Sequence, residues 1–463
     1  MKSLDLTPTN ENVYNSLIND SVGRGEFVRQ FVKMLNAIED NCTIALEGNW
    51  GSGKTFFVKQ VKMVLDAHNP NYQPVNGFLT EERRKAIKEK YSEFNAEDGS
   101  TELKPQLCVY YDAWQNDNDE DPILSLVYSI VKETGPDFSF SKKSTLNICS
   151  ELINLVCDKD ISKLINVLKG ENALDLIRKT KDEADKVSEF LQSLLPEVGE
   201  RLIVFVDELD RCKPSYAVKL LEKIKHYFLD EEITFVFSVN INELQHTIKN
   251  YYGDSFDACR YLDRFFYLRI NLPPVDKKKF YMNIELNGRY YLEIISRRII
   301  DVYNMQLREI TRFYRQVRTA AYVPTHDDEK WNCIFPDGEA RQFMLSCIVP
   351  IIIGLKMVDI SMYEQFISGK SGKPMVDILN TKEFSTGLLC RFLKEDESFS
   401  QIEKKKLITP EEKILEIYNA IFVNKYSGND YRKTIGKCEF DADSRKFVLV
   451  AASMLSQYAN YEI

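Results

Sequence analysis

The sequence of 463 residues lacks the patterns that mark zinc-bound, disulfide-linked and secreted proteins. Its ten cysteines include no C-x-x-C pair and its four histidines are far apart, so we expect no structural zinc site. The first residues, MKSLDLTPTNENVYNS, lack the apolar core of a signal peptide. We therefore expect reduced thiols and a cytoplasmic location.

Long apolar runs and an excess of basic side chains are also missing. The most apolar stretch, FMLSCIVPIIIGL at residues 343–355, is interrupted by Pro350 and Gly354. It is too short to span a bilayer, so we expect a buried helix and no membrane span. The 61 basic and 70 acidic side chains give a net charge of −9, which argues against a dominant nucleic-acid surface. A local basic groove is compatible with this composition.

Residues 48–55 read GNWGSGKT and fit the phosphate-binding pattern G-x-x-x-x-G-K-[ST]. The glycines allow a tight loop whose backbone N–H groups surround phosphate oxygens. Lys54 is placed to reach the β- and γ-phosphates, and the Thr55 hydroxyl is placed to bind Mg²⁺. A strand-like segment, TIALEG, precedes the loop, and a helical segment follows it. The predicted nucleotide-binding residues are Gly48, Asn49, Trp50, Gly51, Ser52, Gly53, Lys54, Thr55 and Phe56.

A second apolar segment, LIVFVDELD, ends in carboxylates. We expect Asp207 to hold Mg²⁺ and Glu208 to polarise the attacking water as a general base, with Lys54 as a further catalytic residue. The next apolar segment, ITFVFSVN, ends at Asn240. The Asn240 side chain is predicted either to sense the γ-phosphate or to cap the following helix, because Asn is a favoured N-cap.

Arginines before a fourth apolar segment, RFFYLRINLPP, are candidates for neutralising charge on the γ-phosphate. Arg260 and Arg264 are four residues apart, which predicts that they share one face of a helix. Surface salt bridges with Asp257 or Asp263 explain them equally well. We choose Arg264, which directly precedes the segment, as the catalytic candidate.

Apolar strand-like segments alternate with helical ones in the first part of the chain, which predicts an α/β fold with a parallel sheet covered on both faces. QLCVYYDA lies in sequence between the loop strand and the acidic strand, which indicates the P-loop NTPase branch with an additional strand and a catalytic glutamate. We expect a P-loop NTPase domain over residues 1–274, with a helical insertion around 115–200, and a helical C-terminal region over 275–463. Within that region Arg308 and Arg312 are weaker candidates for the phosphate arginine, because a solvated helix face explains them better.

Five segments resemble the KAP family of P-loop NTPases: GNWGSGKT, YDAWQNDNDEDPI, LIVFVDELDRCKPSYAVKLLEKIKHYF, FVFSVNINELQHTI and YLDRFFYLRINLPP. The resemblance covers roughly residues 20–325. It implies Mg²⁺-dependent binding and hydrolysis of ATP, used as a switch in assembly or signalling, and bacterial members are linked to phage exclusion. Lys54, Thr55, Asp207 and Glu208 match the family's site residues, and Arg211 matches the arginine of its D-R-C motif.

The chain departs from this family in two places. Many members carry transmembrane helices in the region that matches residues 115–200, where this chain has charged helical segments instead. Membrane anchoring is therefore not carried over to this chain. The second departure is Asn240, which stands at the strand end where the family usually has Asp.

We expect an ATP-hydrolysing switch protein that controls homo-oligomerisation or a partner effector. A nucleic-acid-dependent ATPase motor is one alternative, because D-E-L-D matches a helicase motif, although no Q-x-x-G-R-x-x-R element is present. The other alternative is a non-hydrolytic nucleotide-binding module, which the presence of Lys54, Asp207 and Glu208 argues against.

Overall fold

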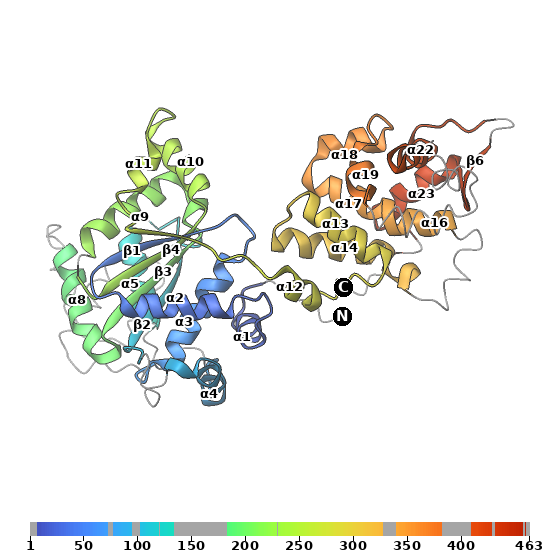
Figure 1. Ribbon diagram of the computed structural model, residues 1–463. Helices are drawn as coiled ribbons and strands as arrows, with labels where there is room; N and C mark the ends of the chain where they lie inside the picture. The colour runs from blue at the N-terminus through green and yellow to red at the C-terminus, as the bar shows by residue number, and fades with distance from the viewer. Residues whose placement is uncertain are drawn as a thin grey trace. The chain divides into compact units, whose positions relative to one another are not determined.

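The computed structural model of the chain describes residues 7–72, 77–94, 102–119, 121–133, 183–228, 230–326, 339–381, 409–427, 431–456 and 459. The chain divides into two compact units between Phe280 and Tyr281. This division lies within helix α12, Lys277–Asn283, a few residues after the predicted domain boundary. The first unit contains a sheet with its covering helices, and the second is mostly helical (Figure 1).

Within the described residues, the first unit has one five-stranded sheet in the order β2-β3-β4-β1-β5. All of its paired strands are parallel, so their carboxyl ends lie at the same edge of the sheet. The strand bounds are Cys42–Glu47 for β1, Gln106–Asp112 for β2, Arg201–Asp207 for β3, Ile233–Val239 for β4 and Leu268–Asn271 for β5.

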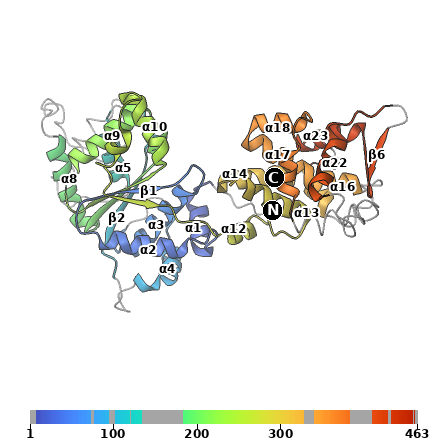
Figure 2. The ribbon, with the colours of Figure 1, turned by 45° about the horizontal axis from the view of Figure 1, so that its top comes forward.

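Helices cover both faces of this sheet (Figures 1 and 2). Along β3, Leu202, Val204 and Val206 belong to the core on one face, whereas Ile203 and Phe205 belong to the core on the other. The first of these cores includes α5 (Pro122–Glu133), α8 (Glu183–Val198), α9 (Pro214–Tyr227), α10 (Ile241–Tyr252) and α11 (Ala258–Leu262). The second includes α1 (Asn10–Asn19), α2 (Gly25–Ala37), α3 (Lys54–His68), α4 (Glu81–Lys90) and η1 (Ser92–Phe94). A strand buried on both faces reads as a continuous apolar run, which explains LIVFV.

The fold is the predicted α/β P-loop architecture, but the sequence pointed to the wrong strand as the additional one. β2, the QLCVYYDA segment, lies at the edge of the sheet. The strand between the loop strand β1 and the acidic strand β3 is β4, which pairs with both. Order along the chain does not give order in the sheet, because helical crossovers let a later strand insert between earlier ones.

Only part of the predicted helical insertion around residues 115–200 is described. α5 and α8 lie within it, and residues 134–182 lie outside the described part of the chain. Both helices contribute side chains to the core on one face of the sheet, including Leu126 of α5 and Phe190 of α8. These two helices therefore belong to the body of the first unit.

The second unit is built mainly from helices, with one element that the sequence analysis missed. Its helices are α13 (Tyr291–Val302), α14 (Leu307–His326), α16 (Glu339–Phe343), η4 (Met344–Ile348), α17 (Val349–Val358), α18 (Ile360–Ile367), α19 (Lys373–Leu379), α22 (Pro410–Phe422) and α23 (Ala442–Ala452). Strands β6 (Arg432–Ile435) and β7 (Cys438–Asp441) pair as an antiparallel hairpin. The hairpin was missed because each strand has only four residues, too few to show a clear alternation of apolar and polar positions.

The most apolar stretch of the chain forms the central part of a continuous helix, Glu339–Val358. The turn before Pro350 is π-helical. A π-helical turn accommodates the proline ring and the missing N–H donor, so the helix is longer than the sequence analysis expected. By length and composition alone this helix is long enough to cross a membrane, but 78% of its most apolar window is buried inside the structure. The buried helix that we expected from this stretch is present.

Candidate functional site

The candidate site lies at the carboxyl edge of the sheet, where four strands end side by side. Asp112 is in register with Asp207, and Glu47 with Val239. The backbone N–H of Gly48 donates to the carbonyl of Val239 at 3.2 Å, which joins the start of the phosphate loop to the end of β4. Parallel pairing therefore brings together residues that are far apart in the sequence, such as Glu47 and Val239, which are 192 positions apart.

The loop of residues 48–53 has the backbone shape that its glycines allow. Gly51 and Gly53 have φ angles of 75° and 93°, in the region that disfavours a side chain. Gly53 is the N-cap of α3, so the first N–H groups of that helix face the loop without a helical partner. Backbone donors and the positive end of a helix are what a phosphate group needs.

Two side chains of the predicted nucleotide-binding set have well-defined surroundings. Nζ of Lys54 donates to the carbonyls of Gly48 at 2.7 Å and Asn49 at 3.2 Å, so the ammonium group lies against the loop. Burial lowers the pKa of Lys54, although carboxylates nearby oppose this. The Phe56 ring is partly buried and packs against the core.

Thr55 and Asp207 come together as the sequence analysis expected for a metal-binding pair. The Thr55 hydroxyl donates to Oδ2 of Asp207 at 2.6 Å, and the Tyr110 hydroxyl donates to the same oxygen at 2.9 Å. Oδ1 of Asp207 accepts the backbone N–H of Glu208 at 3.0 Å. A hydroxyl beside a buried carboxylate is an all-oxygen donor set, which suits Mg²⁺ in company with phosphate oxygens. No cluster of three or more His, Cys, Asp or Glu side chains that could hold a metal occurs in the described parts of the chain.

Glu208 follows β3 in a left-handed backbone conformation, with a φ angle of 60°. This conformation is uncommon for a residue with a side chain and turns the chain sharply after Asp207. Oε2 of Glu208 is 2.5 Å from Nε of Arg211. Burial and the neighbouring Asp207 raise the pKa of Glu208 to about 7, and Arg211 opposes the rise. A carboxylate with a pKa near neutrality is suited to take a proton from water.

Asn240 lies beside this site, at the end of β4. It occupies the N-cap position of α10, but its side chain makes no capping hydrogen bond. The structure therefore gives no support to the capping explanation. The Asn240 backbone is hydrogen-bonded to the buried carboxylate of Asp210, which also accepts a bond from Nε1 of Trp50 at 2.6 Å.

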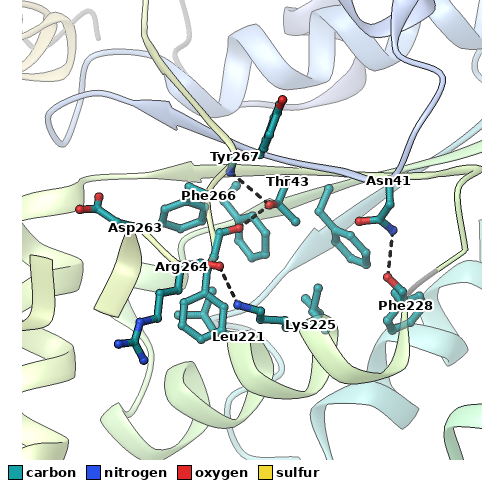
Figure 3. A pocket seen from close by; sticks show the side chains of 13 residues that line it. Asn41, Thr43, Leu221, Lys225, Phe228, Asp263, Arg264, Phe266 and Tyr267 are labelled. Atoms are coloured by element: carbon teal, nitrogen blue, oxygen red, sulfur yellow. Dashed lines mark hydrogen bonds between the residues drawn. The ribbon is translucent and has the colours of Figure 1, made fainter. Parts of the chain in front are cut away.

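Arg264 does not lie at this edge of the sheet, so the structure does not bring it together with the phosphate loop of the same unit, and its catalytic role stays a prediction. It lines a cavity of about 370 Å³ together with Asn41 and Thr43, at the start of β1. The Arg264 side chain is exposed, and its carbonyl accepts a bond from Nζ of Lys225 at 2.9 Å (Figure 3). Because Arg264 precedes a parallel strand, it lies at the amino edge of the sheet, opposite the phosphate loop.

The other arginine candidates are exposed surface residues. Arg260 lies in the short helix α11, which ends at Leu262, so Arg260 and Arg264 do not share a helix face. Nε of Arg260 is 3.5 Å from Asp257, one of the two salt bridges considered for it. Arg308 and Arg312 are exposed on α14 of the second unit.

Three residues around the site were missed by the sequence analysis. Arg24 is 4% exposed and donates from Nη1 to the carbonyl of Ser52 at 3.1 Å, so a buried guanidinium lies against the phosphate loop. Tyr110 contacts Asp207, and Trp114 lies beside Arg211. Trp114 lies in the YDAWQNDNDEDPI segment that carries the family resemblance, but no role was predicted for it. The sequence signal for Tyr110 was its place near the end of an apolar strand, and Arg24 gave none.

Comparisons with known proteins give a family for the chain. The family model of the KAP family P-loop domain matches residues 24–323, which is more than half of the chain. The search of curated proteins found no match to the chain. Among solved structures it is similar to the Aeropyrum pernix ORC2 protein in ADPNP-ADP complexes, at 13% identity over 94% of this chain and 93% of that chain. The TM-score of 0.32 is too low for this likeness to bear on fold or function. By its matching domain, the chain belongs to the KAP family of P-loop NTPases.

Proposed function

We propose that the chain is a Mg²⁺-dependent ATP-hydrolysing switch protein whose nucleotide state controls its own oligomerisation or a partner effector. The observation that carries this proposal is the 2.6 Å contact between Thr55 and Asp207, with Glu208 as the next residue. It joins the phosphate loop to a carboxylate suited to hold the metal and to a second carboxylate suited to activate water.

Each residue of the site has a role in this proposal. The N–H groups of the loop and Lys54 bind the phosphates, and Thr55 and Asp207 hold Mg²⁺. When bound, Mg²⁺ neutralises charge on the phosphate oxygens. Glu208 accepts a proton from the attacking water, and the Asn240 side chain orients that water or senses the γ-phosphate.

The switch role, the partner and the cellular setting rest on the family and not on the site. We propose bacterial anti-phage defence in the cytoplasm as the setting, by analogy with family members linked to phage exclusion. The second unit begins at Tyr281, within the residues that the family model matches, and extends beyond them. It is the part of the chain that we propose to act as a lid or to bind a partner.

The test is ATP hydrolysis by the purified full chain with Mg²⁺, with its mass measured by light scattering with and without ATP. We expect turnover and an ATP-dependent change in mass. Lys54→Ala should lose nucleotide binding, whereas Lys219→Ala, an exposed lysine on α9, should behave as wild type. Turnover with no change in mass would contradict control of oligomerisation by the nucleotide. Binding with no turnover would favour the non-hydrolytic module, and turnover that requires DNA would favour the motor.

A further inference from the structure

The Arg211 side chain contacts the carboxylate of Glu208 and the rings of two tryptophans in the site. Its Nε is 2.5 Å from Oε2 of Glu208, and both side chains are mostly buried. Arg211 lies in the one-turn helix η3, Leu209–Arg211, which directly follows Glu208. The backbone N–H of Arg211 donates to the carbonyl of Glu208 at 3.1 Å, so the turn itself holds the two residues together.

Two tryptophans from separate elements flank the Arg211 guanidinium. Its central carbon is 5.6 Å from the ring centroid of Trp50, in the phosphate loop, and 5.7 Å from that of Trp114, which follows β2. Both distances are within the range of a cation–π contact. Trp50 and Trp114 are 45% and 51% exposed, so both lie at the surface beside Arg211.

The indole N–H of Trp50 makes a second contact with η3. Its Nε1 donates to Oδ2 of Asp210 at 2.6 Å, and Asp210 is the residue before Arg211. The phosphate loop is therefore connected to η3 twice, through the Trp50 ring to Arg211 and through the Trp50 N–H to Asp210. Contacts therefore run without a break from Trp50 through Arg211 to the carboxylate of Glu208.

We propose that Arg211 is a positioning residue for Glu208, and that Trp50 and Trp114 hold its guanidinium so that the conformation of the phosphate loop is transmitted to the Glu208 carboxylate. This inference rests on the proposed function, in which Glu208 is the general base. In this proposal Arg211 acts through Glu208, whose carboxylate its Nε contacts, while the two rings hold the guanidinium.

A kinetic comparison separates this positioning role from a structural one. Arg211→Gln should lower kcat by roughly 10- to 100-fold, a large part of what a general base contributes, and should leave KM within about 3-fold of wild type. Arg211→Lys keeps the charge and should recover part of kcat. Arg432→Gln, an exposed arginine in the hairpin of the second unit, is the matched control. A loss of nucleotide affinity equal to the loss of kcat would overturn the proposal.

The double variant tests whether Arg211 acts through Glu208. In the Glu208→Gln background, Arg211→Gln should cause no further loss of turnover, because the residue that it positions has already lost its function. A further loss of the same size as in the wild-type background would show that Arg211 acts on the phosphates itself, and would overturn the proposal.

Tryptophan emission gives a test that does not depend on hydrolysis. The chain has three tryptophans, and the third, Trp331, lies outside the described residues. In a Trp331→Phe background, MgADP should change the emission of Trp50 and Trp114, and Arg211→Gln should abolish most of that change. An unchanged response in Arg211→Gln would contradict transmission through Arg211. This result is informative even if the wild-type protein has no ATPase activity, which would contradict the proposed function alone.

Discussion

Thr55 and Asp207 are 152 positions apart in the sequence, yet the hydroxyl of one lies 2.6 Å from the carboxylate of the other. Thr55 is the second residue of α3, which follows β1 through the phosphate loop, and Asp207 is the last residue of β3. β4 lies between β1 and β3 in the sheet, so the two residues come from elements that are not neighbours in it. The phosphate loop and the acidic strand are thereby parts of one site.

The first prediction concerns Mg²⁺ and follows from this contact. Thr55→Ala should raise the Mg²⁺ concentration that gives half-maximal turnover by about 10-fold, because one oxygen donor is lost. Thr55→Ser keeps the hydroxyl and should stay within about 2-fold of wild type. A Mg²⁺ titration of ATP hydrolysis for the three proteins measures this. Identical titration curves would contradict a metal-binding role for Thr55.

A second prediction concerns the buried Arg24. Burial lowers the pKa of Arg24 to about 10, and none of the described carboxylates forms an ion pair with it. Its Nε has no hydrogen-bond partner among the described residues. A buried charge without a partner is unfavourable for folding, so we expect it to serve the phosphate loop through its contact with Ser52.

Arg24→Met should therefore leave the Tm of the protein without nucleotide unchanged or higher, and should weaken nucleotide affinity by roughly 10-fold, or about 1.4 kcal/mol. Thermal unfolding with and without nucleotide measures both effects. Arg24→Lys, which keeps the charge, should retain more of the nucleotide-dependent rise in Tm. If Arg24→Met instead lowers Tm by several degrees while the nucleotide-dependent rise is kept, Arg24 serves only the fold.

A third prediction concerns stability away from the site. Nζ of Lys62, in α3, is 2.7 Å from Asp66 and 3.2 Å from Glu133. The Asp66 side chain is almost fully buried, whereas that of Glu133 is partly exposed. Lys62→Met should lower the free energy of unfolding by about 3 kcal/mol, because it leaves the Asp66 charge buried without its partner.

The double variant Lys62→Met with Asp66→Leu should recover at least half of that loss, since both charges are then removed together. Urea unfolding of the wild type, Lys62→Met and the double variant measures the free energy of unfolding of each protein. If the double variant is less stable than Lys62→Met alone, the unpaired charge is not the cause of the loss.

Sequence reasoning identified the parts of the candidate site whose chemistry is carried by local patterns. GNWGSGKT and the carboxylates after β3 are short motifs whose residues are adjacent in the chain, so their spacing is visible without a structure. Sequence reasoning failed where the answer depends on the order of strands. β4 could not be recognised as the central strand, and QLCVYYDA was taken for it, because pairing is set by how helices pack across the sheet and not by chain order.

The position of Arg264 relative to the phosphate loop follows from the sequence once the strands are taken as parallel. A residue before a parallel strand lies at the amino edge of the sheet, and the phosphate loop follows its strand at the carboxyl edge. Arg24 and Tyr110 could not have been found in the same way. Their roles depend on contacts with Ser52 and Asp207, which are distant in sequence and follow no fixed spacing.

The measurement that tests the central claim most directly compares wild type with Glu208→Gln for ATP turnover and for nucleotide affinity. The variant keeps the size and shape of the side chain but cannot accept the proton of the attacking water. We predict a loss of turnover of about 10²- to 10⁴-fold with nucleotide affinity retained. Turnover close to wild type, or an equal loss of binding and turnover, would contradict Glu208 as the general base.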